Sequence, residues 1–198
     1  NNIIDSSKLE IGYMDIKFEN SNIVYLVEEV VLSIVDIAKD KNIEIIFNTE
    51  EEEIITAIDE EKIVRVILIL SNSIKFSKEK GDICVEMRRE DEEVVIKVTD
   101  NGIGINEDMK EKIFDKFKRV QSVSNLNVDH EGSGLGLYIA KGFIELHNGS
   151  ISVVSEVEKG STFIITMPIV IIKNDLHNIN HMDEDELNRI IKIELSDL

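Results

Sequence analysis

Three alternating glycines stand directly before a run of residues with helical spacing. Gly132, Gly134 and Gly136 occur in the stretch EGSGLGL, and apolar residues at helical intervals follow them. Glycine lets the backbone approach a ligand closely, and the free N–H groups at the start of a helix favour an anion. The stretch is therefore either a phosphate-binding turn or a flexible turn before a helix. It lacks the G-x-G-x-x-G order of a dinucleotide site.

An asparagine and a lysine, Asn72 and Lys75, lie one helical turn apart in the stretch SNSIKF. The segment 63–70 before them is apolar nearly all round, which predicts a buried helix. A buried amide must find hydrogen-bonding partners. Asn72 is therefore either a helix-end residue that bonds a nearby loop or part of a ligand site.

An aspartate, Asp100, ends a strand-like run in the stretch VTDNGIGI, and Gly102 and Gly104 follow it in a turn. D-N-G is a very common turn signal, so a plain turn is the simplest interpretation. A buried carboxylate at a strand end can instead accept a specific N–H from a ligand. Thr162, in the stretch KGSTF, opens the last run with strand-like alternation.

The net charge limits the partners of the protein. The chain has 198 residues and a formal net charge of −18, which argues against nucleic acid or an anionic membrane as the main partner. Any phosphate site must therefore be local, built from backbone N–H groups, a few cations and a metal ion. The acidic runs at 50–53 and 183–186 are interpreted as solvated loop or helix-start residues. No apolar run is long enough for a transmembrane helix.

The elements that must position these residues mix strands and helices without a regular alternation. Strands are expected at 13–20, 43–49, 53–58, 82–89, 93–100, 149–157 and 160–169, and helices at 1–12, 21–41, 59–77, 105–117 and 135–147. This mixture predicts an α/β sandwich of the α+β class, a mixed β-sheet with a layer of helices on one face. A further amphipathic helix is expected at 183–198, with Leu187, Ile190, Ile191 and Leu195 on one side.

Five motifs occur in a fixed order over residues 59–163: N-S-I-K-F, D-N-G-I-G-I, I-F-D-K-F, G-S-G-L-G-L and G-S-T-F. In this order they resemble the ATP-binding catalytic domain of sensor histidine kinases, a Bergerat-type fold in the superfamily that includes gyrase and MutL. The resemblance implies the end of a dimerisation-domain helix and a linker at 1–16 and the catalytic domain at 17–170. An ATP lid is implied at 121–131. Residues 171–198 lie outside the resemblance and are expected to form a helical C-terminal appendage.

The resemblance also implies ATP and Mg2+ as cofactors. Asn72 would hold the metal ion, Lys75 would face a phosphate, and Arg119 would approach the terminal phosphate. Asp100 would accept the adenine amino group, with Thr162 sharing a water beside it. Gly102 and Gly104 would shape the turn under the adenine, and Phe114 and Phe117 would anchor the loop that follows them. Backbone N–H groups for the phosphates would come from Gly132, Ser133, Gly134, Leu135 and Gly136.

The family function is transfer of the γ-phosphoryl of ATP to a histidine on the dimerisation domain and then to a response regulator. None of the four histidines, at 130, 147, 177 and 181, lies in the expected S-H-E-like box. His147, in ELHNGS, is interpreted as a helix C-terminal cap. We therefore expect a fragment of a longer, homodimeric kinase, located in the cytoplasm or in the cytoplasmic part of a membrane-bound sensor.

Leu68 departs from the family pattern. It lies four residues before Asn72, where the family usually has a polar residue near the terminal phosphate. An apolar residue there brings the efficiency of transfer into question more than nucleotide binding. A regulatory module that senses ATP or ADP without transferring phosphate is therefore the alternative. ATP hydrolysis of the gyrase type is disfavoured, since it needs an acidic base in place of Leu68.

Overall fold

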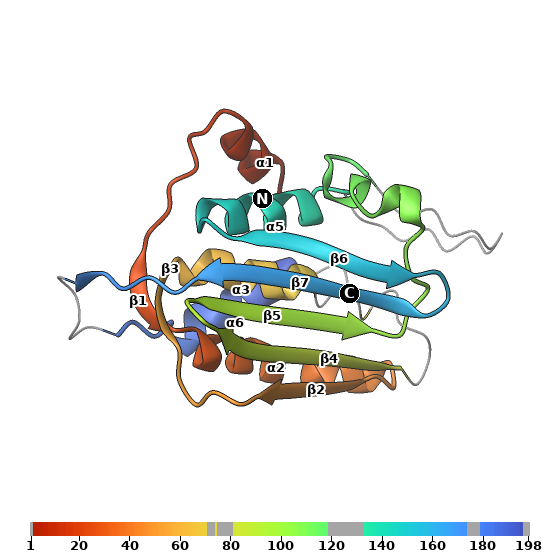
Figure 1. Cartoon of the computed structure of the whole chain (residues 1–198), viewed down its shortest axis with the longest axis horizontal. Coiled ribbons are helices and arrows are strands. Elements are labelled where there is room, and N and C mark those ends of the chain that lie inside the picture. The colour runs from red at the N-terminus through yellow and green to blue at the C-terminus, as the bar shows by residue number, and fades with distance from the viewer. Residues whose placement is uncertain (1, 71–73, 75–80, 119–132, 174–178, 196–198) are drawn as a thin grey trace.

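The computed structural model describes residues 2–70, 74, 81–118, 133–173 and 179–195. A mixed five-stranded sheet forms the centre of the structure (Figure 1). In spatial order its strands are β2 (Glu44–Thr49), β4 (Asp82–Glu90), β5 (Glu93–Asp100), β7 (Gly160–Pro168) and β6 (Ser150–Glu156). β2 and β4 pair in parallel, and the other neighbours are antiparallel.

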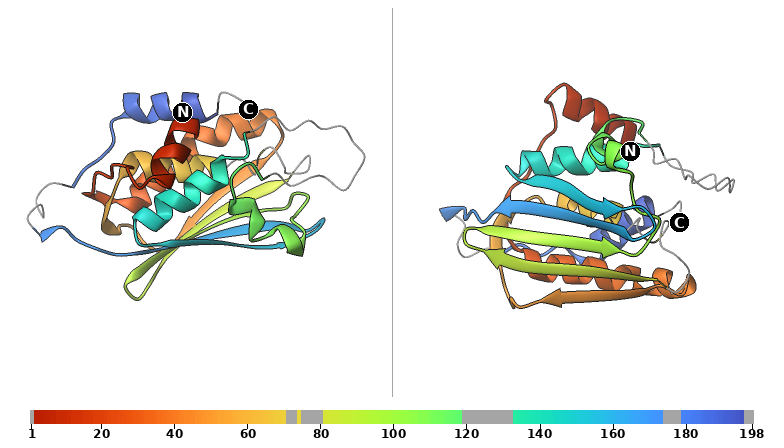
Figure 2. Two further views of the ribbon diagram at one scale, coloured as in Figure 1. Left: turned by 90° about the horizontal axis from the view of Figure 1, so that it is seen from above. Right: turned by 45° about the vertical axis from the view of Figure 1, so that its right-hand side comes forward.

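The helices lie on one face of this sheet, as the view along its edge shows (Figure 2). They are α1 (Asn2–Glu10), α2 (Ile23–Asp40), α3 (Glu60–Leu70), α5 (Gly136–Leu146) and α6 (Glu184–Glu194). α3 contacts α2 and α5 on its two sides, α6 packs on α3, and α1 packs on α5. The predicted α/β sandwich is confirmed.

The apolar pattern of the sequence explains which surfaces are buried. α2 begins after the N-cap Asn22, whose side chain accepts the N–H of Val24 at 3.1 Å, and its apolar stripe faces the core. α3 is buried on nearly all sides because the sheet, α2, α5 and α6 surround it. The residues of α3 that are at most 6% exposed are Ile63, Val64, Val66, Ile67, Leu68 and Ile69. The prediction of a buried helix is confirmed for residues 63–69.

The first strand differs from the prediction at 13–20. β1 (Glu19–Asn22) pairs antiparallel with β3 (Ile55–Ile58) in a separate two-stranded sheet. The alternation before β1 forms no strand: Tyr13 is 76% exposed and Phe18 is 38% exposed, while Met14 packs partly buried against the core.

Residues 105–117 form two short 3-10 turns, η1 (Glu107–Met109) and η2 (Lys112–Phe114), in place of the expected helix. Ile113 and Phe114 are buried as direct neighbours, not at helical spacing, and the second turn points both of them inward. The expected extension of the helix to residue 77 falls on 71–73 and 75–77, outside the described residues, apart from Ile74, which is helical.

The C-terminal helix is part of the main hydrophobic core. The four apolar residues expected on one side of this helix are the ones that α6 and its C-cap bury, Leu187, Ile190, Ile191 and Leu195. α6 begins after Asp183, whose side chain accepts the N–H of Glu186 at 2.8 Å. Within the described residues, no helix is both long and apolar enough to cross a membrane.

Candidate functional site

Asp100 ends the central strand β5 with its side chain 7% exposed. Its Oδ1 accepts the backbone N–H of Gly102 at 2.8 Å, and the backbone N–H of Ser161 also bonds the carboxylate. Burial raises the pKa of Asp100, although the two N–H groups act in the opposite direction. The structure thus holds a buried, fixed acceptor at the end of a strand.

The hydroxyl beside Asp100 belongs to Ser161, which corrects the expectation for Thr162. Asp100 pairs with Ser161 across β5 and β7, whereas Thr162 pairs with Thr99, and their two hydroxyl oxygens lie 3.0 Å apart. Successive side chains of a strand point to opposite faces, so Thr162 lies on the face away from Asp100. The sequence carried this signal, because Ser161 shares its parity with the buried Phe163.

The turn after Asp100 is fastened to the hairpin between β6 and β7. The N–H of Ile105 donates to Oγ of Ser155 at 2.8 Å, and the N–H of Glu158 donates to the carbonyl of Ile103 at 2.8 Å. Gly104 has a φ of +69°, and a Cβ there would collide with the carbonyl of Glu156. Gly104 is therefore required for close approach of two backbones, which fixes the turn that carries Gly102.

The two phenylalanines of I-F-D-K-F anchor their segment in different ways. Phe114 is buried at 7% exposure in the core, but the side chain of Phe117 is 70% exposed. Phe117 is held by its backbone, since its N–H donates to the carbonyl of Gly134 at 2.9 Å. Gly134 has a φ of +68°, and a Cβ there would lie 2.9 Å from the carbonyl carbon of Phe117. This bond brings together the two chain ends that flank residues 119–132.

Helix α5 begins without a capping side chain. Its N-cap residue, Leu135, makes no side-chain cap hydrogen bond within the described part of the chain, and its first turn contains no acidic residue. The Oγ of Ser133 accepts the N–H of Leu135 at 3.3 Å, one step before the helix. The start of α5 lies against the end of α3, since a Cβ on Gly136 would be 3.5 Å from Ile69. The first-turn N–H groups are thus suited to an anion.

A family model described as "Histidine kinase-, DNA gyrase B-, and HSP90-like ATPase" matches residues 58–171, more than half of the chain. The chain belongs to this ATPase family. The match runs from the start of α3 to just beyond β7, so it includes the end of β5 and the start of α5. The resemblance inferred from the five motifs is confirmed.

Known relatives are histidine kinases. A histidine kinase of Formosa agariphila is 32% identical over 174 residues, 85% of this chain and 12% of that protein. The sensor histidine kinase WalK of Bacillus subtilis is 36% identical over 136 residues, 67% of this chain and 22% of that protein. The chain thus spans between about an eighth and about a quarter of the length of these two relatives.

Solved structures share the fold. The nucleotide-free catalytic domain of the histidine kinase ThkA matches with a TM-score of 0.68 at 27% identity, over 78% of this chain and 99% of that chain. Full-length ShkA in complex with AMPPNP matches with a TM-score of 0.74 at 24% identity, over 87% of this chain and 35% of that chain.

Several expected site residues of this histidine kinase-like ATPase lie outside the described residues: Asn72, Lys75, Arg119, Gly132 and the lid at 121–131. Leu68, by contrast, is described and is fully buried in the hydrophobic core. The end of α3, the start of α5 and the end of β5 lie at the same end of the molecule (Figure 1). In the described part of the chain, no group of three or more His, Cys, Asp or Glu side chains could hold a metal ion.

His147 has a structural position at the end of α5. It is the C-cap residue, its Nδ1 lies 2.7 Å from the carbonyl of Phe143, and its Nε2 accepts the N–H of Asp59 at 3.0 Å. An imidazole that donates at Nδ1 and accepts at Nε2 is neutral, in agreement with burial lowering the pKa of His147. The predicted cap is confirmed, and the same ring also ties the end of α5 to the start of α3.

Proposed function

We propose that the chain is the ATP-binding catalytic part of a two-component sensor histidine kinase. It would transfer the γ-phosphoryl of ATP to a histidine on a dimerisation domain, and a response regulator would receive the phosphoryl next. The observation that carries the proposal is the pairing of a buried acceptor, Asp100, with the uncapped start of α5 in a member of this ATPase family. The relatives' names support the kinase class.

The described residues fit a nucleotide at both of its ends. Asp100 offers a carboxylate oxygen to the amino group of adenine, and the hydroxyl of Ser161 on the same face is placed to share a water with it. At the other end, backbone N–H groups of the first turn of α5 would face the phosphates. The first turn of α5 contains no carboxylate that would repel them.

The remaining roles are assigned from the family pattern. Asn72 would bind Mg2+ through its side-chain oxygen, while Lys75 and Arg119 would contact the phosphates. When bound, Mg2+ would neutralise part of the negative charge of the phosphates. Phosphoryl transfer depends mainly on positioning and charge stabilisation, so this chain needs no nucleophile of its own.

The proposal includes the partners and the arrangement of the whole protein. Residues 1–16 would continue from the dimerisation domain, residues 17–170 form the catalytic domain, and 171–198 a C-terminal addition. A solved structure shows ThkA in complex with the response regulator TrrA, and it matches this chain at 25% identity with a TM-score of 0.68. It supports a response regulator as the downstream partner. The full-length protein would be a homodimer with its catalytic part in the cytoplasm.

Two measurements, made one after the other, test the proposal. ATP with Mg2+ at about 100 times its Kd adds about 2.7 kcal/mol of stability, a shift in Tm of about 5–10 °C for a chain of this size. The second measurement is transfer of labelled γ-phosphate to a separately supplied dimerisation domain. Nucleotide binding without any transfer favours the alternative, an ATP- or ADP-sensing module. The observation that favours the sensing module is that Leu68 is apolar and fully buried. Absence of binding contradicts both.

A further inference from the structure

Buried polar side chains of the body hold the segment at the end of the family match at 58–171 and directly after it. Asn20 is 1% exposed, and its amide both donates to the carbonyl of Ile172 at 3.0 Å and accepts the N–H of Ile172 at 2.9 Å. Thr56 is fully buried, and its Oγ1 accepts the N–H of Val170 at 3.0 Å. These groups need partners when buried, and the C-terminal segment supplies them. The segment is therefore a specifically docked element.

The docking continues up to the start of α6. Glu60, at the start of α3, accepts the side-chain amide of Asn180 at 2.8 Å, and the N–H of Asn180 donates to the carbonyl of Asn20 at 2.7 Å. α6 then lies on α3 and buries its apolar side there. The outer side of α3, which would otherwise face water, is covered in this way.

Arg65, in the middle of α3, joins three helices. Its guanidinium is buried at 8% exposure for the residue and lies 5.1 Å from the ring centroid of Phe143. Nε donates to Oε1 of Glu194 on α6 at 2.7 Å. Nη2 donates to Oδ2 of Asp5 on α1 at 2.9 Å and to Oδ1 of Asn2 at 3.2 Å. One cation therefore bonds the two ends of the chain.

Helix α1 also contacts the body through Leu9 and Glu10. Leu9 fills the space over Gly142 on α5, where a Cβ would lie 2.7 Å from its Cδ1. Glu10 forms an ion pair with Lys116 at 2.6 Å, with Glu10 largely exposed. An exposed pair of this kind contributes little. The bond between Arg65 and Asp5 is more buried than this pair.

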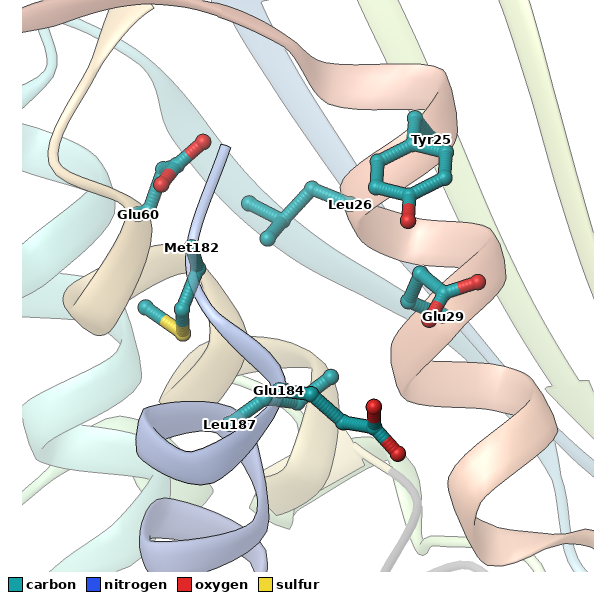
Figure 3. A pocket seen from close by; sticks show the side chains of 7 residues that line it. All are labelled: Tyr25, Leu26, Glu29, Glu60, Met182, Glu184 and Leu187. Atoms are coloured by element: carbon teal, nitrogen blue, oxygen red, sulfur yellow. The ribbon is translucent and has the colours of Figure 1, made fainter. Parts of the chain in front are cut away.

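The contact of α6 with α2 is incomplete at its N-terminal end. A cavity of about 100 Å³ lies between α2, α3 and α6, and Figure 3 shows carboxylates of all three helices, Glu29, Glu60 and Glu184, around it. Burial raises the pKa of Glu60 beside this gap. The gap leaves α6 incompletely packed on α2 at this end.

We propose that α6 controls how firmly α1 is held, and that Arg65 transmits the effect. A guanidinium presents its donors in a fixed planar fork, so bonding Glu194 through Nε orients Nη2 toward Asp5. α6 also excludes water from Arg65, and the attraction between Arg65 and Asp5 is stronger in a drier surrounding. Release of α6 leaves Arg65 solvated and free to rotate, which loosens α1.

The consequence for signalling rests on the proposed function, in which α1 continues from the phosphoacceptor domain. Any event that displaces α6 would then free the connection between that domain and the catalytic body. The coupling between α6 and α1 does not depend on that function, and it can be measured without nucleotide or phosphoacceptor.

Hydrogen exchange of the 198-residue chain tests the coupling with Glu194→Gln. The negative charge of Glu194 is unfavourable at the C-terminal end of a helix, so its removal should favour isolated α6. We expect the amides of α1 nevertheless to exchange about fivefold faster or more, the scale of ordinary coupling between two sites. The matched control is Glu186→Gln, which removes a carboxylate of α6 whose partner, Arg189, is 3.8 Å away on the surface. It should accelerate exchange in α1 far less than Glu194→Gln does, because Glu186 does not bond Arg65.

The reciprocal variant makes the test decisive, because coupling between two sites acts equally in both directions. Asp5→Asn should accelerate amide exchange in the last turn of α6, which contains Glu194, although Asp5 and Glu194 are far apart in the sequence. The proposal is overturned if Glu194→Gln loosens only α6 and Asp5→Asn loosens only α1. Equal acceleration in β5 would also overturn it, since α6 would then be an ordinary part of one cooperative core.

Discussion

Replacing Asp100 by Asn should separate nucleotide binding from stability. Burial raises the pKa of this carboxyl in the folded state, so its contribution to stability is present below the unfolded pKa, about 3.9, and is lost as the pH rises through the folded pKa. At pH 7 the buried charge therefore lowers the free energy of unfolding. Asn removes the charge and keeps one oxygen as the acceptor for the N–H groups of Gly102 and Ser161. We expect the variant without nucleotide to be at least as stable as the wild type.

Nucleotide binding should respond in the opposite way. The Asn amide presents its NH2 group to the adenine amino group, where the wild type presents an acceptor. A hydrogen bond to a charged group contributes about 1.5–3 kcal/mol, and a donor left without an acceptor costs about 1–3 kcal/mol. Together these terms amount to about 3 kcal/mol or more, which weakens Kd about a hundredfold or more.

Thermal unfolding with and without ATP and Mg2+ measures both effects at once. At a concentration of about 100 times the wild-type Kd, stabilisation should fall from about 2.7 to about 0.4 kcal/mol, and the Tm shift to about 1 °C. Thr162→Val is the matched control, because Thr162 bonds Thr99 on the opposite face of the sheet. It should keep the full shift, whereas Ser161→Ala should lose part of it. A full shift in Asp100→Asn would refute the assigned role.

Three further predictions concern buried groups. His147→Leu leaves the buried N–H of Asp59 without its acceptor and should cost about 1–3 kcal/mol, measured by urea unfolding. Because burial lowers the pKa of His147, the wild type should also lose stability relative to His147→Leu as the pH falls through about 6.5; a constant difference would contradict a neutral ring. Because burial raises the pKa of Glu60, the wild type should gain stability relative to Glu60→Gln between pH 7 and pH 4; the reverse trend would contradict this cause. Leu68→Asn places an amide at a fully buried site and should cost about 2–5 kcal/mol, whereas a stable variant with faster transfer to a supplied histidine would show that a polar group belongs there.

The fold could be predicted because its main elements carry strong periodic signals. α2 presents one apolar stripe to the core, and α3 is apolar nearly all round because four neighbours cover it. The paired strands β4 and β5 alternate and are joined by a polar turn, so they too were visible. Asp100 and the start of α5 were identified through the family resemblance that the five motifs carry in their order.

The features that sequence reasoning missed depend on pairing between distant parts of the chain. Arg65 bonds Asp5 and Glu194, which are 60 and 129 residues away, and no local pattern marks either carboxylate as its partner. β1 was expected too early and too long for the same reason. Its partners, β3 and Ile172, lie far along the chain and leave no local pattern at Glu19–Asn22. The error over Thr162 was avoidable from the sequence. Counting alternate residues back from the buried Phe163 identifies Ser161 as the residue on the inner face of β7.

A strongly acidic chain can bind an anionic nucleotide because its charge is unevenly distributed. The acidic run at 50–53 lies between β2 and β3, and the run at 183–186 lies at the start of α6. Both are at the end of the molecule opposite to the start of α5 (Figure 1). Interactions between exposed charges are largely screened beyond about 8 Å at physiological ionic strength. The phosphates would therefore respond mainly to the uncapped, acid-free first turn of α5, so the net charge of −18 does not argue against the proposed site.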